Sequence, residues 1–278
     1  MSILEIVHRT HFVYETEVPT SYNEARLIPA FLPRQRVLST EVEISPLTWQ
    51  TQYFDYWESR VIAFEVLRPH KELSVTSYST VEVLPEKEPR EPADWDALLG
   101  PKLQDLLTEY LVNSPTTEPS EELAAFAREA AADHTPDETA RLVCAHLHDT
   151  IRYVPGVTTV HTPAVHAWEE RSGVCQDFAH LAVGALRTVG IPARYVSGYL
   201  HPRADAEIGE TVRGESHAWI EWWSGGWRGI DPTNASDAGD HHVVVARARE
   251  YRDVMPLSGV FSGAESSLDV DVQVTRRA

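Results

Sequence analysis

The chain has 278 residues, 42% hydrophobic and 9% aromatic, which is typical of a folded protein with a sizeable core and about two domains. Its formal net charge of −18, from 24 Lys and Arg against 42 Asp and Glu, argues against nucleic-acid binding, because phosphate contacts need clustered basic side chains. Two cysteines are too few for a disulfide framework, so free thiols are expected.

The chain also lacks the usual marks of export or membrane insertion. Residues 1–20 have neither the basic region nor the apolar region of a signal peptide. No run approaches the roughly 18 consecutive apolar residues of a transmembrane helix. We therefore expect a cytoplasmic protein without a membrane partner.

Residues 1–85 have the pattern of antiparallel β-structure. The runs ILEIVHRTHFVY, RVLSTEVEI, RVIAFEVL and ELSVTSYSTVEVL are rich in β-branched and aromatic residues with partial alternation, and Pro-containing breaks separate them. They predict an all-β, sandwich-like N-terminal domain. Nothing in this stretch suggests catalysis, so we expect it to pack against the rest of the protein or to frame a substrate.

A charged, Pro-rich segment follows, and we interpret residues 86–100 as a linker to a second domain over 101–278. The composition then becomes helical. Thr135 as N-cap, Pro136 in the first turn and Glu138 three residues after the cap predict a capping box. The apolar spacing along that helix predicts that Cys144 is buried.

The second cysteine opens another helix-periodic run. Cys175 shares a stripe with Phe178, Ala179, Ala182, Leu186 and Val189, whereas Asp177, Gly184, Arg187 and Thr188 lie opposite. Gly190 and Pro192 predict the end of the helix. A thiol at a helix N-terminus has a lowered pKa, because unpaired N–H groups and the helix dipole favour an anion there. Cys175 is therefore either a reactive thiol or a small buried hydrophobic residue.

A nucleophilic thiol needs a base and a group that orients the base. His217 opens the strand HAWIEWW, and Asp231 closes the next strand, WRGID. A three-residue turn at 224–226 would pair Trp219 with Asp231, which places Asp231 diagonally from His217 on the same face. A two-residue turn would place the two side chains on opposite faces. The two glycines favour the three-residue turn.

Each of these residues also has a plain structural explanation: a core cysteine, a strand histidine and an Asp-Pro turn. Their order and geometry together favour catalysis. A metal site is the other reading, formed by Cys175 with His161, His166, His180 and the His241–His242 pair. Because no CxxC or HxxxH spacing appears, we expect no metal.

The segments GVCQDFAHLAVGALRTVGIPARYVSGYL, SHAWIEWW and GWRGIDPTN, in this order, resemble the transglutaminase-like superfamily, in particular its bacterial cysteine-peptidase branch. The N-terminal run HRTHFVYETEVPTSYNEARLIPAFLPRQRVL and the closing runs YRDVMPLSGVFSG and LDVDVQVTR are similar to the corresponding parts of that branch. FDYWESRV departs from it, since many relatives have a Gly-Asn turn there. The resemblance implies an α+β fold: a papain-like, transglutaminase-like core with an antiparallel sheet and an N-terminal nucleophile helix, after the all-β domain.

The resemblance also implies roles: Cys175 as nucleophile, His217 as base and Asp231 as the orienting carboxylate. The expected reaction is hydrolysis of a peptide or isopeptide bond through a thioester, without a cofactor, and the expected partner is a peptide or small amide substrate. A glutamine-directed transglutaminase or deamidase, and a non-catalytic interaction module, are the alternatives. The Cys175 N–H is the natural oxyanion donor, and Gln176 and Tyr153 are candidates for the second donor.

Overall fold

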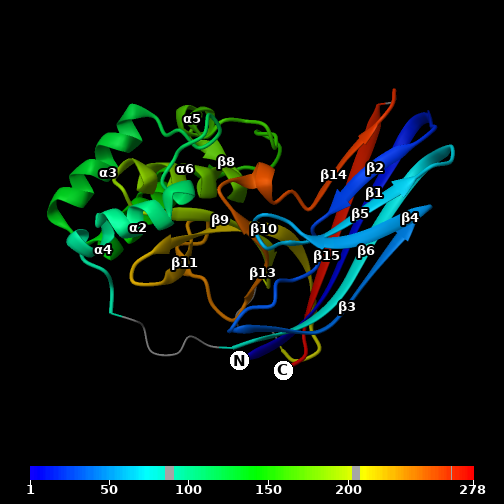
Figure 1. The fold of residues 1–278 in the computed structure, drawn as a ribbon, viewed down its shortest axis with the longest axis horizontal. Helices are drawn as coiled ribbons and strands as arrows, with labels where there is room; N and C mark the ends of the chain where they lie inside the picture. Colours follow the sequence, from blue (N-terminus) through cyan, green and yellow to red (C-terminus); the bar gives the residue numbers. More distant parts are fainter. Residues whose placement is uncertain (85–90, 202–206, 264) are drawn as a thin grey trace.

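The N-terminal part of the chain is built from strands in the computed structural model, which describes residues 1–84, 91–201, 207–263 and 265–278 (Figure 1). Buried and more exposed positions alternate along most of the first strand, as the sequence pattern predicts. The all-β character expected for this part is thus found in residues 1–84. The strands are β1 (Ser2–Val18), β2 (Ser21–Ala25), β3 (Gln35–Ser45), β4 (Trp49–Phe54), β5 (Arg60–Val66) and β6 (His70–Val83).

The helices follow and gather on one side of the molecule (Figure 1). The predicted capping box is confirmed: the Glu138 N–H donates to Thr135 Oγ1 (3.3 Å), and the Thr135 N–H donates to Glu138 Oε2 (2.9 Å). Cys144 is fully buried, as predicted. Within the described residues, no helix is both long and apolar enough to cross a membrane. The helices are α1 (Trp95–Leu98), α2 (Pro101–Leu106), the 3-10 turn η1 (Thr108–Tyr110), α3 (Glu121–Asp133), α4 (Pro136–Thr150), α5 (Ala164–Glu169) and α6 (Cys175–Thr188).

The expected linker, residues 86–100, is partly helical. Residues 85–90 lie outside the described residues. The Asp94 side chain accepts a hydrogen bond from the Ala97 N–H (2.8 Å) and begins α1, whose Leu98 is fully buried. A single helical turn produces no repeating apolar pattern, so sequence periodicity did not predict this helix.

The remaining strands complete two large sheets. The larger one has the order β12-β11-β10-β15-β1-β6-β3, with β9 also paired to β10 and β13 paired to β9. The smaller has the order β14-β2-β5-β4, and β7 and β8 form a short parallel pair. These strands are β7 (Arg152–Tyr153), β8 (Ser172–Gly173), β9 (Ala193–Leu200), β10 (Thr211–Trp223), β11 (Trp227–Asp231), β12 (Ser236–Asp237), β13 (His242–Ala248), β14 (Leu257–Phe261) and β15 (Ser266–Arg276); the 3-10 turn η2 (Tyr251–Asp253) precedes β14.

The C-terminal strands belong to both halves of the chain. β15 pairs with β1 from Leu4–Arg276 to Tyr14–Ser266, and its end also pairs with the start of β10. β14 pairs with β2. Backbone hydrogen bonding therefore runs continuously from the N-terminal strands into the second half. The division into domains 1–85 and 101–278 stays a prediction.

The hairpin in the run FDYWESRV forms without a Gly-Asn turn. β4 and β5 pair up to Phe54–Arg60, and the Asp55 carboxylate accepts the N–H groups of Trp57 (3.0 Å) and Ser59 (2.9 Å). Glu58 takes the positive φ, 62°, that glycine or asparagine usually takes. The Asp55 carboxylate thus stabilises a turn in which Glu58, rather than glycine, has the positive φ.

Helix α6 lies between the sheet and the other helices. It packs on β9 and β10 and contacts α3, α4 and α5. Gly190 (φ 83°) follows its last residues, as predicted. The apolar stripe is buried except for Cys175 and Val189, which are half-buried, and the side predicted to lie opposite it is buried too: Asp177 is 0% and Arg187 4% exposed. The chain before α3 covers that side, where the Arg187 Nη1 donates to the Val112 carbonyl (3.1 Å).

Candidate active site

Cys175 is the first residue of α6, with Val174 as N-cap. The Asp177 carboxylate folds back over the turn and accepts the Val174 N–H (2.8 Å) and the Thr158 hydroxyl (2.6 Å). Burial raises the pKa of Asp177, and these two hydrogen bonds oppose that effect. A Cβ on Gly173 would lie 2.7 Å from Asp177 Oδ2, so only glycine fits there without a shift. Together these contacts fix the turn that carries the thiol.

The β10–β11 hairpin has the predicted register. Trp223 pairs with Trp227 and Ile220 with Ile230, which leaves a three-residue turn with Gly225 at φ 71°. Continuing this register sets Asp231 opposite Trp219, diagonal to the histidine two residues earlier. The geometric prediction is therefore confirmed.

His217 and Asp231 form a short hydrogen bond between Nε2 and Oδ2 of 2.6 Å. Cys175 lies close enough to His217 to contribute to the raised pKa of that histidine. Because Nε2 is taken by Asp231, Nδ1 is the nitrogen left for the thiol. The structure thus brings together the three side chains singled out in the sequence.

The electrostatics of the three groups favour a charged imidazole. Burial alone would lower the pKa of His217, but the hydrogen bonds and negative charges of Asp231 and Cys175 raise it to about 10. Burial alone would raise the pKa of Asp231, but hydrogen bonds from His217 and His242 keep it well below its usual range. A charged imidazole beside a cysteine is the arrangement that activates a thiol as a nucleophile.

Asp231 has further partners that the sequence did not identify. The Thr233 and Asn234 N–H groups donate to Oδ1 (3.0 and 3.2 Å), and Asn234 Nδ2 donates to Oδ2 (2.8 Å). His242 Nε2 lies 3.4 Å from Oδ2. The Gly239 N–H donates to His242 Nδ1 (3.2 Å), so the hydrogen of this ring is on Nε2 and is donated to Asp231.

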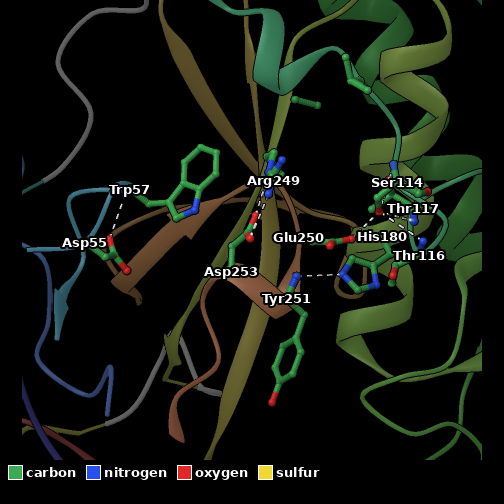
Figure 2. A network of polar contacts seen from close by, with 12 residues as sticks. Asp55, Trp57, Ser114, Thr116, Thr117, His180, Arg249, Glu250, Tyr251 and Asp253 are labelled. Carbon is green, nitrogen blue, oxygen red and sulfur yellow. Dashed lines mark hydrogen bonds and ion pairs between the residues drawn. The ribbon is translucent and has the colours of Figure 1, made fainter. Parts of the chain in front are cut away.

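Side chains of η2 and β9 lie beside α6. The His180 Nε2 on α6 accepts the Tyr251 N–H (3.1 Å), and Arg249 and Asp253 face each other across η2 with contacts of 3.0 and 3.2 Å (Figure 2). Burial lowers the pKa of His180 to about 3, so the ring is a neutral acceptor. Burial raises the pKa of Tyr251 and of Tyr195, and the negative charge of Cys175 raises both further. Both phenols therefore lie near Cys175. The sequence had not singled out Tyr251.

The histidines of the hypothetical metal site do not lie together. His180 and His242 each accept a backbone N–H, whereas His161 is exposed in the loop before α5 and His166 is exposed on α5. Among the described residues, no group of three or more His, Cys, Asp or Glu side chains is arranged to hold a metal ion.

The two candidates for a second oxyanion donor occupy different settings. Gln176 follows Cys175 in α6 and is 7% exposed. Tyr153 is 45% exposed, on the short strand β7, where it pairs with Gly173 two residues before the thiol. The Cys175 N–H lies in the first turn of α6, where N–H groups lack acceptors within the helix. The oxyanion role of Gln176 or Tyr153 stays a prediction.

Comparison with known proteins identifies the family of this chain. Residues 124–232 match the family model of the transglutaminase-like superfamily, and residues 4–82 match that of the bacterial transglutaminase-like N-terminal region. An uncharacterized protein of Mycobacterium leprae is 42% identical over 99% of each chain. This chain belongs to the transglutaminase-like superfamily.

Two further comparisons bear on this transglutaminase-like chain. A structure from Cytophaga hutchinsonii, described as that of a candidate cysteine protease, superposes with a TM-score of 0.77, covers 99% of this chain and 91% of that one, and is 19% identical. It confirms the transglutaminase-like, papain-like fold. A protein-glutamine gamma-glutamyltransferase of Pseudomonas aeruginosa is 33% identical over 32% of this chain and 15% of its own length.

Proposed function

We propose that this protein is a thiol enzyme that cleaves amide bonds and hydrolyses the resulting thioester. The observation that carries the proposal is the line of contacts from Cys175 through His217 to the buried Asp231, with a His217–Asp231 distance of 2.6 Å and a His217 pKa raised to about 10. A peptide or a small amide is the proposed substrate.

In the first half-reaction, the Cys175 thiolate attacks the amide carbonyl carbon and forms a tetrahedral oxyanion. His217 gives its Nδ1 proton to the leaving nitrogen as the C–N bond breaks, which leaves a thioester and a free amine. In the second, neutral His217 takes a proton from water and the hydroxide attacks the thioester carbonyl. The C–S bond then breaks, which regenerates the ion pair and releases a carboxylic acid that gives its proton to the solvent. Asp231 holds the ring in position throughout.

Transfer to an amine is the second candidate reaction. The similarity to the Pseudomonas aeruginosa gamma-glutamyltransferase supports it, although that similarity spans only part of each chain. The triad chemistry is the same until the thioester meets either water or an amine. A glutamine side chain is then the acyl donor, and ammonia the leaving group.

Mass spectrometry of the protein after incubation with a peptide library tests the proposal. We expect an acyl adduct on Cys175 and, for the wild type, released carboxylate products. Cys175→Ala should abolish the adduct and slow turnover by about a thousandfold or more. Cys144→Ala is the matched control and should change neither, because Cys144 is fully buried on α4. Turnover that survives in Cys175→Ala contradicts the proposal.

Two further measurements distinguish hydrolysis from transfer to an amine and from a non-catalytic module. With a primary amine such as monodansylcadaverine present, hydrolysis predicts mainly free carboxylate, whereas a transglutaminase predicts the fluorescent amide. Iodoacetamide labelling at pH 6 should modify Cys175 faster than a free cysteine, because the charged His217 stabilises the thiolate. Labelling no faster than for free cysteine would favour a non-catalytic module.

A further inference from the structure

A cavity of about 680 Å³ lies next to the triad, but none of Cys175, His217 and Asp231 lines it. One wall comes from β10 and β11, where Trp219, Glu221, Trp223 and Trp227 face the cavity. The facing wall is the N-terminal segment 32–36. The cavity therefore lies between the two halves of the chain, and its volume is within the usual range for small-molecule sites, about 300–1,000 Å³.

The charge inside this cavity is unbalanced. Glu221, 7% exposed, accepts Arg194 Nε and Arg247 Nη2, both at 2.7 Å, from the strands β9 and β13. Burial alone would raise the pKa of Glu221, but Arg247 and Arg194 lower it, so the carboxylate stays charged. Two guanidinium groups share one carboxylate, which leaves one positive charge in excess.

The second guanidinium also has unused hydrogen-bonding capacity. Arg247 Nε is buried and has no acceptor among the described residues. Burial lowers the pKa of Arg247, so its charge lacks the solvation it would have in water. Arg194 and Arg247 also line a neighbouring cavity of about 960 Å³, together with Glu58 and Glu109.

The rest of the wall contributes three further arginines. Five arginines and one carboxylate line the cavity, in a protein whose formal net charge is −18. Some of the arginines are already paired, as Arg36 is with Glu82 and Arg228 with Asp137. The excess positive charge at Glu221 does not depend on those pairs, because Arg194 and Arg247 both donate to this one carboxylate.

Aromatic rings supply the apolar part of the cavity. The Arg194 guanidinium stacks 3.9 Å from the Trp227 ring centroid, and Trp223 meets Trp227 edge to face at 5.6 Å. A flat apolar group fits against such rings, while a carboxylate fits the planar donors of an arginine.

We propose that this cavity binds a small organic anion, with a carboxylate at Arg247 and Arg194 and a flat apolar body against Trp223 and Trp227. Two side chains of the cavity wall also contact the triad. Trp219 stacks on His217 with ring centroids 6.3 Å apart, and the cavity-lining His242 donates to Asp231. A ligand here occupies a position separate from the thiol.

Calorimetric titration of the full chain with phthalate tests the proposal, with uncharged phthalamide and inorganic phosphate as comparisons. We expect saturable binding of phthalate, quenching of tryptophan fluorescence and no binding of phthalamide. Binding of phosphate alone, or of none of the three, would overturn the proposal. The measurement does not use the thiol, so it is repeated in Cys175→Ala, and its outcome is independent of the enzymatic activity.

Two variants with opposite expectations locate the site. Arg247→Gln removes the excess charge and should weaken phthalate binding about tenfold or more. Glu221→Gln doubles the excess and should tighten binding about tenfold and increase the rise in melting temperature that phthalate produces. Arg213→Gln, on β10 outside the cavity and 79% exposed, is the matched control and should change nothing. If Arg247→Gln fails to fold, Glu221→Gln decides, and unchanged binding in it refutes the site.

Discussion

A carboxylate without solvent contact keeps its charge only when other donors replace the water it has lost. Asp231 is fully buried, and the turn after β11 supplies such donors through Thr233 and Asn234. The carboxylate that faces His217 is therefore held by the run DPTN as well as by the hairpin. His242 adds a donor from β13, on the side of the cavity.

Stability should depend on pH through His217. Its pKa is raised from the ordinary 6.5 to about 10, so its contribution is fully present below about pH 6.5 and is lost as the pH rises through about 10. The pKa of Asp231 is lowered, so its own contribution is constant over this range and is lost only in acid. We expect the stability advantage of the wild type over His217→Gln to fall by about 2 kcal/mol between pH 6 and pH 10.

Urea denaturation at a series of pH values measures this difference. His161→Gln, at an exposed loop position, is the control and should leave the pH dependence of the wild type unchanged. An advantage over His217→Gln that stays constant up to pH 10 would show that the imidazole is not held in its charged form.

The sequence was sufficient for residues whose relation is local. Helix periodicity places Cys175, and strand parity across one turn places His217 against Asp231. Asn234 was quoted within a motif, but its amide contact needs the actual turn conformation. His242 was considered only as a metal ligand. Its contact with Asp231 depends on how β13 pairs with β9, and the local sequence does not encode that pairing.

At the scale of elements, α6 is unusual because polar and small residues lie on a side that is also buried. The carbonyl of Thr117 approaches so closely that a Cβ on Gly184 would lie 1.8 Å from it. Asn113 Nδ2 donates to the Gly184 carbonyl (3.2 Å) from the same segment. Periodicity identified the apolar side, but a segment crossing the opposite side leaves no mark in the helix's own pattern.

Gly184→Ala should therefore be destabilising, although alanine is normally favoured over glycine inside a helix by about 1 kcal/mol. The overlap with a backbone atom requires the 112–119 segment to move, and we expect a loss of about 3 kcal/mol. Gly239→Ala is the control, since its Cβ would have no neighbour closer than 3.9 Å. Urea denaturation measures both, and a more stable Gly184→Ala variant would contradict the close approach.

At the scale of the whole molecule, β15 holds the two halves of the chain together. It lies between β1 and β10, so the last strand in sequence is hydrogen-bonded to the first strand and to the strand that carries His217. Composition predicted β1, β15 and the HAWIEWW part of β10, but not the beginning of β10, which pairs with β15. The pairing of these strands was not predictable, because contacts over more than 200 residues depend on which edges remain free after the local hairpins have formed.

Two valines of β15 test whether this strand couples the halves. Val274 is 0% exposed and pairs with Ile6 and Val212, whereas Val270 is 42% exposed. Val274→Ala removes two methyl groups between β1 and β10 and should cost about 2 kcal/mol, while Val270→Ala should change stability by less than about 0.5 kcal/mol. Denaturation is followed separately by tryptophan fluorescence, which reports mainly on the second half of the chain, and by far-ultraviolet circular dichroism, which reports on the whole backbone. Both signals should show one coincident transition, and Val274→Ala should shift it in both. If only one signal moves, the halves unfold independently, and the shared sheet is not what joins them.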